Sequence, residues 1–259
     1  TLLLGADKLL QEKIVTSLFE NSEGTGSIHV AITQGVIKVL MENDKAKRAS
    51  ELLPLMAHGA VVSVFKVEQI RYDNLSPFYT TSVNLIAGAE STLSELLIKN
   101  AYAALLNGSL NAVRQQKKDL IQNMRLISEI LALSAVKSSQ DLSMDKATFV
   151  RNVATGLLES AVSNSLSKEV KLDEPATLIE GAVEGLSVGL VLGLVSNKVP
   201  LEGAGDIIKS ATQSAAGTTV RMGKSLQLDS GRILDFALMS SRGSTSGIVR
   251  LIEDKRTGS

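Results

Sequence analysis

Residues 176–195 read ATLIEGAVEGLSVGLVLGLV, and glycines recur in this stretch at every fourth position: Gly181, Gly185, Gly189 and Gly193. On a helix this spacing places all four on nearly one face, along about three turns. Each glycine inside a helix costs roughly 0.5–1 kcal/mol relative to alanine, so a run of four needs a compensating gain. The usual gain is the close approach of a second backbone. These four glycines, called the glycine ladder below, are our candidate site for helix packing and interaction.

The sequence before the ladder shares part of its pattern. Residues 147–170 align without gaps on residues 176–199, an offset of 29, and Gly156 falls on Gly185. An apolar residue followed by an acidic one recurs at similar spacing, at Met144-Asp145, Leu172-Asp173, Leu201-Glu202 and Leu228-Asp229. An acidic residue in that place caps the free amides of a following helix. We therefore predict that residues 89–259 form an array or bundle of helices in units of about 28 residues.

Two further regions precede these units. Residues 110–136 predict one long amphipathic helix, with Val113, Leu120, Met124, Ile127 and Leu131 along one stripe. Residues 1–88 predict a smaller mixed region, with helices over 4–20 and 50–56, strands over 28–32, 36–40 and 60–72, and a boundary loop over 74–81. The predicted fold class is α+β, predominantly α, with a mixed region (1–88) followed by a helical array (89–259).

The composition excludes several classes of site and partner. The chain has no cysteine, which excludes disulfides, thiolate metal sites and cysteine nucleophiles. The 27 basic residues balance the 27 acidic ones, so we expect no general attraction to nucleic acid. The three-leucine run that follows Thr1 is too short for the core of a signal peptide. We expect the protein in the cytoplasm or within an assembled particle, with Thr1 consistent with a processed terminus.

Short motifs with possible chemistry are incomplete. Residues 217–225 resemble a phosphate-binding loop, but Thr218 stands where that loop needs its first glycine, so we predict a helix ending at Gly223. Ser134 with Lys137, and Ser165 with Lys168, have the spacing of acyl-serine enzymes without the partner motifs. His29 and His58 have no metal-ligand spacing. The sequence therefore assigns no catalytic, cofactor-binding or metal-binding residue.

The basic residues gather in two places. One group is residues 114–118, and the other is near the end of the chain, at Arg242, Arg250, Lys255 and Arg256. Neither group is interleaved with aromatic residues, as a nucleic-acid site would be. We interpret both groups as solvated surface or subunit contacts.

These patterns favour a non-catalytic structural or assembly protein, for example a virion or filament component, that self-associates or packs on a protein scaffold. Two alternatives stay open. Residues 176–195 are long enough to cross a bilayer, as in pore formation or delivery, although Glu180 and Glu184 make insertion costly. The other alternative is an enzyme with a small-molecule pocket at the domain junction, near Tyr72, Tyr79 and His58.

Overall fold

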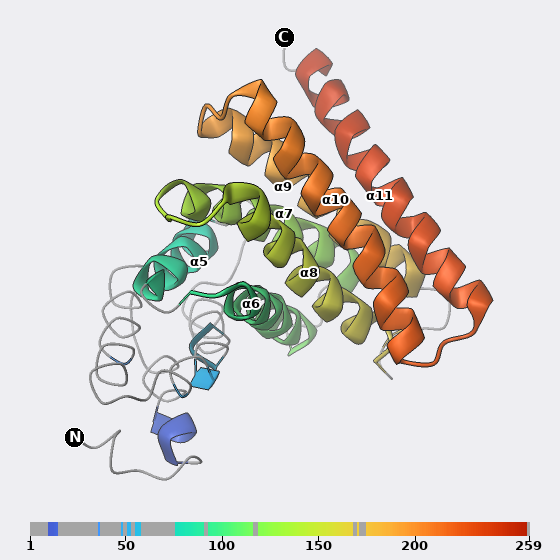
Figure 1. Cartoon of the computed structure of the whole chain (residues 1–259). Coiled ribbons are helices and arrows are strands. Elements are labelled where there is room, and N and C mark those ends of the chain that lie inside the picture. Colours follow the sequence, from blue (N-terminus) through green and yellow to red (C-terminus); the bar gives the residue numbers. More distant parts are fainter. Residues whose placement is uncertain are drawn as a thin grey trace.

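The computed structural model describes residues 10–14, 36, 48, 51–52, 55–57, 76–90, 93–115, 119–167, 170 and 175–257. From Ser76 to Thr257 these residues form seven helices joined by short links (Figure 1). The helices are α5 (Ser76–Gly88), α6 (Glu95–Gln115), α7 (Leu120–Gln140), α8 (Lys146–Ser165), α9 (Pro175–Ser196), α10 (Leu201–Ser225) and α11 (Ser230–Thr257). The chain is thus predominantly helical, as predicted for its larger part.

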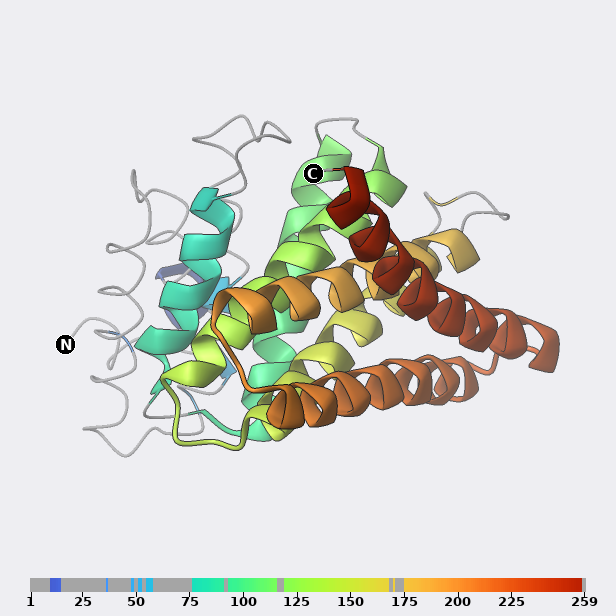
Figure 2. The same cartoon turned by 90° about the horizontal axis from the view of Figure 1, so that it is seen from above.

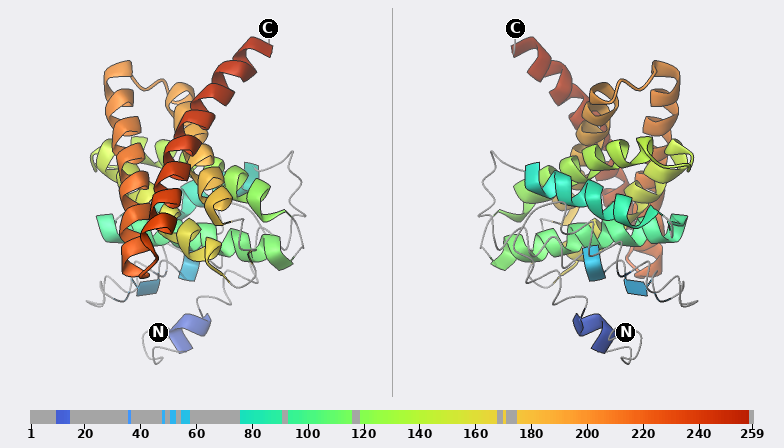
Figure 3. Two further views of the ribbon diagram at one scale, coloured as in Figure 1. Left: turned by 90° about the vertical axis from the view of Figure 1, so that its right-hand side faces the viewer. Right: turned by 90° about the vertical axis from the view of Figure 1, so that its left-hand side faces the viewer.

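The helices stack in two columns, because each helix makes its most extensive contacts with the helix two places away along the chain. One column consists of α5, α7, α9 and α11, and the other of α6, α8 and α10. Successive helices therefore alternate between the columns, and each pair of successive helices adds one helix to each column. At the far end, α10 and α11 share a turn and then diverge (Figures 2 and 3).

Two of the predicted acidic caps are confirmed. The Asp145 carboxylate accepts a hydrogen bond from the backbone N–H of Thr148 at 2.7 Å, where α8 begins. Asp229 accepts one from the N–H of Arg232 at 2.9 Å, where α11 begins. Glu202 was predicted to cap α10 but lies inside its first turn, because Pro200 takes the cap position and α10 starts two residues earlier than predicted. The pair at 172–173 lies outside the described residues.

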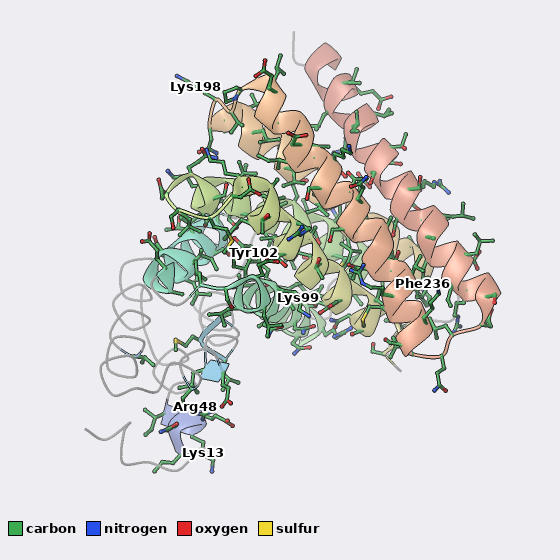
Figure 4. The ribbon with its side chains drawn as sticks, in the orientation of Figure 1. Lys13, Arg48, Lys99, Tyr102, Lys198 and Phe236 are labelled. Carbon is green, nitrogen blue, oxygen red and sulfur yellow. The ribbon has the colours of Figure 1, made fainter. Side chains whose placement is uncertain are left out.

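Aliphatic side chains and alanines build the core, with few aromatic rings. Tyr102 of α6 and Phe149 of α8 meet edge to face, with ring centroids 6.2 Å apart. Phe236 of α11 is buried near the turn that joins α10 to α11 (Figure 4). Small side chains let neighbouring helices approach closely, so the packing depends on where those side chains stand.

The mixed α+β prediction for residues 1–88 is wrong for the part that the structure describes. No described residue lies in a strand, and those between 10 and 57 are helical. Val36, predicted to begin a strand, is helical and buried against the core. A short apolar run has the same pattern in a buried helix as in a strand, which explains the error. The predicted strands at 28–32 and 60–72 lie outside the described residues.

Two other boundaries differ from the prediction. From Ser76 onward, the predicted loop over 74–81 is the start of α5, since a proline such as Pro77 is tolerated in the first turn of a helix. The predicted long helix over 110–136 is two helices, because α6 ends at Gln115 and α7 begins at Leu120. Asp119 caps α7 by accepting a hydrogen bond from the N–H of Gln122 at 3.0 Å.

Candidate interaction site

The glycine ladder faces α7 of the same chain. A Cβ atom added to Gly185 would lie 2.1 Å from the carbonyl oxygen of Arg125, and one added to Gly189 would lie 2.0 Å from that of Glu129. Cβ atoms do not approach a backbone oxygen so closely, so alanine at either position would force α7 and α9 apart. At these two layers only glycine permits the observed separation of the helices.

The two ends of the ladder are less tightly packed. A Cβ atom on Gly181 would lie 3.5 Å from the carbonyl oxygen of Ile121, an ordinary van der Waals distance. One on Gly193 would lie 2.8 Å from the Cβ atom of Val136, so that side chain would have to shift. The ladder therefore closes a contact within the chain, and its middle is the part that tolerates no added atom.

The aligned glycine in the other column makes the same contact. A Cβ atom on Gly156 of α8 would lie 2.1 Å from the carbonyl oxygen of Lys99 in α6. The Lys99 ammonium also pairs with Glu159 of α8 at 3.1 Å (Figure 4). The offset of 29 residues that aligns Gly156 with Gly185 thus corresponds to an equivalent helix-to-helix contact in each column.

A further glycine pair joins α11 to the other side of α9. Cβ atoms on Gly243 and Gly247 would lie 2.5 Å from the carbonyl oxygen of Glu180 and 2.9 Å from that of Glu184. This Gly-x-x-x-Gly pair was missed in the sequence analysis, although its four-residue spacing is the same signal as that of the ladder. α9 is therefore held between α7 and α11 by glycine contacts on both sides.

Charged side chains surround these contacts. Glu184 of α9 lies 3.5 Å from Arg125 of α7 and 3.4 Å from Arg250 of α11, and Arg250 also lies 3.4 Å from Glu129 of α7. Burial raises the pKa of the Glu129 carboxyl, while the charges of Arg250 and Arg125 act in the opposite direction. The four side chains link three successive helices of one column. The two carboxylates and the two guanidinium groups carry opposite charges, and this pairing stabilises the carboxylates next to the ladder.

An apolar groove lies between α9, α10 and α11. Its enclosed volume is about 100 Å³. The lining side chains are Leu186, Ser187, Leu190 and Val191 of α9, Ile208, Ala211 and Thr212 of α10, and Ser244, Thr245 and Ile248 of α11.

The outward face of α11 continues from this groove. Six exposed residues recur there at alternating intervals of four and three: Leu234, Leu238, Ser241, Thr245, Ile248 and Ile252. We call them the α11 seam, because this spacing is that of a coiled-coil interface. The opposite face of α11 carries the buried residues Phe236, Ser240, Gly243 and Gly247. The sequence analysis missed the seam, since Ser241 and Thr245 interrupt its apolar pattern.

The described residues of the incomplete sequence motifs lie in helices and have structural roles there. Residues 217–225 lie inside α10, which continues past Gly223 to Ser225, so the predicted end at Gly223 is wrong. Gly223 is instead buried, and a Cβ atom there would lie 2.7 Å from Ile233. The hydroxyl groups of Ser134 and Ser165 each donate to a backbone carbonyl of their own helix at 2.8 Å.

Some of the other candidate residues lie outside the described part of the chain. Thr1, His29, His58, Tyr72 and Lys168 lie outside the described residues. Within the described ranges, no three His, Asp or Glu side chains are grouped as a metal site would require. Arg114 donates to the side chain of Asn164 at 2.8 Å, a contact between α6 and α8. Of the basic residues near the end of the chain, Arg250 and Arg242 form ion pairs within the chain.

Among the described helices, α9 is the one whose length and composition would allow it to cross a membrane. Two thirds of its most apolar window (67%) is buried by the other helices. The core helix of a protein that never meets a bilayer passes the same test, so this finding is weak evidence for membrane insertion.

Comparison of the chain with protein-family models, curated proteins and solved structures gives no match. The fold itself therefore defines the class: a two-column stack of helices, closed internally by glycine contacts. Within that stack, the exposed apolar seam lies on α11, the last described helix of its column.

Proposed function

We propose that the protein is a non-catalytic assembly protein that binds another protein chain through the α11 seam. The supporting observation is the contrast between α10 and α11, the last described helices of the two columns. Apart from Leu201, the exposed residues of α10 are polar, charged or glycine. On α11, by contrast, Leu234, Leu238, Ile248, Val249 and Ile252 are each 45–59% exposed.

This contrast has a physical meaning in a stacked protein. Within the described residues no further helix covers α10 or α11, and a face of a helical stack that meets water is normally polar. α10 follows that rule, whereas α11 exposes a row of large apolar side chains. Large apolar side chains exposed along one helix face are typical of a surface that binds another molecule. The small-residue faces that were expected to bind a partner are used within the chain, and the seam provides a surface for one.

The size of the seam predicts a moderate affinity. Burying the exposed half of a Leu, Ile or Val side chain contributes about 0.7–1.5 kcal/mol. Four such side chains on each of two partners give a gross gain of roughly 6–12 kcal/mol, against an association cost of about 4–15 kcal/mol. The net affinity corresponds to a dissociation constant on the order of micromolar or weaker. Association should therefore respond to protein concentration.

Sedimentation velocity over a concentration series tests the proposal. We expect the wild type to shift toward faster-sedimenting species as its concentration rises. The variant Leu238→Gln/Ile248→Gln should remain monomeric, because it places two amides in the middle of the apolar row. Leu201→Gln is the matched control, since Leu201 is 91% exposed but lies outside the seam. A wild type that sediments as a monomer throughout would overturn the proposal, as would equal behaviour of the double variant and the control.

The membrane-active alternative has α9 as its supporting observation. Insertion of α9 would have to break the glycine contacts with α7 and α11 and separate Glu184 from both of its arginine partners. The assembly proposal requires no such rearrangement, because the α11 seam is already exposed.

A further inference from the structure

We propose that the partner of the α11 seam is α11 of a second copy of this chain, packed antiparallel across a two-fold axis at the level of residue 243 along the helix. This inference rests on the proposed function and names its partner. It also specifies a register, so it can fail while the proposed function stands.

The seam is self-complementary about Gly243. In an antiparallel pair centred there, Leu234 lies opposite Ile252 of the second copy, because the two positions are equally far from residue 243. Leu238 likewise lies opposite Ile248, and Ser241 lies opposite Thr245. Large apolar side chains therefore meet at both ends of the pair. The two hydroxyl residues meet in the middle, where small side chains permit close approach of the helices.

The two edges of the seam distinguish an antiparallel pair from a parallel one. On one edge, Arg242 is 68% exposed and pairs with Glu180 at 3.0 Å. On the other edge, Ser244 lines the apolar groove between α10 and α11, together with Thr245 and Ile248 of the seam itself. Antiparallel helices place like edges together, so the two grooves adjoin and the two Arg242–Glu180 pairs meet across the axis. Parallel helices would instead place each charged edge against the apolar edge of the other copy.

The apolar area of the pair corresponds to a weak, transient dimer. The seam runs from Leu234 to Ile252, about 27 Å along the helix. Eight half-exposed apolar side chains, four from each copy, offer roughly 240–480 Å² of apolar area for burial, below the ~1,000 Å² of a stable specific interface. The pair would also continue the column, with α9 and α11 of one copy followed by α11 and α9 of the other.

Cysteine cross-linking tests the register without background, because the chain has no cysteine. Leu234→Cys and Ile252→Cys are prepared separately, then oxidised alone and as an equimolar mixture. We expect a covalent dimer in the mixture only. In the antiparallel pair, two copies of residue 234 are separated by about 27 Å along the axis, far beyond the reach of a disulfide, which needs Cα atoms within about 7 Å. A mixture of Leu234→Cys with Leu201→Cys is the control and should remain uncross-linked.

Each other outcome has a definite meaning. Covalent dimers formed by either variant alone would overturn the antiparallel arrangement and leave the α11 docking surface standing. An uncross-linked mixture, with a wild type that still associates, would overturn the inference alone. A wild type that is monomeric throughout would remove the proposed function itself, and this inference with it.

Charge reversal gives a second test that adds no cysteine. Arg242→Glu should weaken dimerisation several-fold, because it places four carboxylates at the axis. Adding Glu180→Arg should restore it, since the pair of opposite charges is re-formed. Unchanged dimerisation in Arg242→Glu would overturn the placement of the axis.

Discussion

The variant Gly185→Ala adds a single methyl group at the tightest part of the ladder. The new Cβ atom would lie 2.1 Å from the carbonyl oxygen of Arg125 and 2.9 Å from the backbone nitrogen of Glu129. Both atoms belong to the backbone of α7, so relief requires a shift of the whole helix. Overpacking of this kind costs about 1–3 kcal/mol, and we expect the upper part of that range. Because alanine recovers about 1 kcal/mol of helix propensity, the net loss of unfolding free energy should be about 1–2 kcal/mol.

Gly205→Ala is the matched control for this substitution. It makes the same chemical change inside α10, where no atom lies within 4 Å of the added Cβ. There the helix propensity acts alone, so the variant should gain about 0.5–1 kcal/mol. Gly181→Ala makes the same change within the ladder at an ordinary contact distance of 3.5 Å, and should lose no stability.

Thermal unfolding followed by circular dichroism separates these cases. For a chain of this size, 1 kcal/mol corresponds to about 2–4 °C in Tm. Gly185→Ala should therefore melt about 2–8 °C below the wild type, and Gly205→Ala about 1–4 °C above it. All variants are compared at one protein concentration, because association makes Tm depend on concentration. If Gly185→Ala melted as high as Gly205→Ala, the close contact between α7 and α9 would be refuted.

Three further predictions concern caps, charge and membranes. Asp145→Ala should cost about 1 kcal/mol, whereas Asp145→Asn keeps the cap at neutral pH. Hydrogen bonds from Thr148 lower the pKa of Asp145, so its stabilisation is present above its unfolded pKa and lost as pH falls through the folded one. Burial raises the pKa of Glu129. Its contribution to the unfolding free energy is therefore largest below the unfolded pKa and is lost as pH rises through the folded pKa. Denaturant titrations should therefore show that the unfolding free energy of Glu129→Gln, relative to that of the wild type, is higher at about pH 7 than at about pH 4. In liposome leakage assays, neither the wild type nor Gly189→Leu should release dye, and release by the wild type would instead support the membrane-active alternative.

The packing inside the columns could be read in part from the sequence. The spacing of the ladder predicts a close helix contact, and the offset of 29 residues brings Gly156 and Gly185 into alignment. The structure gives both glycines the same carbonyl contact at 2.1 Å. Such features are readable because a glycine inside a helix is costly and needs a local reason. Asp145 was readable as a cap for a similar reason, since its carboxylate bonds to an amide only three residues away.

The alternation of the helices between two columns could not be read in this way. It depends on contacts between helices that are two places apart, and the repeat alone does not say which neighbours touch. Val36 was misassigned because its burial in a helix depends on distant partners. The α11 seam was missed because Ser241 and Thr245 interrupt its apolar pattern, and only the fold shows that Leu234 and Ile252 are exposed.

The central claim is that the exposed face of α11 binds another copy of the chain, and the molar mass in solution tests it most directly. Light scattering on a dilution series should give a mass that rises from 27.4 kDa toward twice that value as the concentration increases. The same series with Leu238→Gln/Ile248→Gln should stay at the monomer mass. A wild-type mass of 27.4 kDa at every concentration would contradict the account.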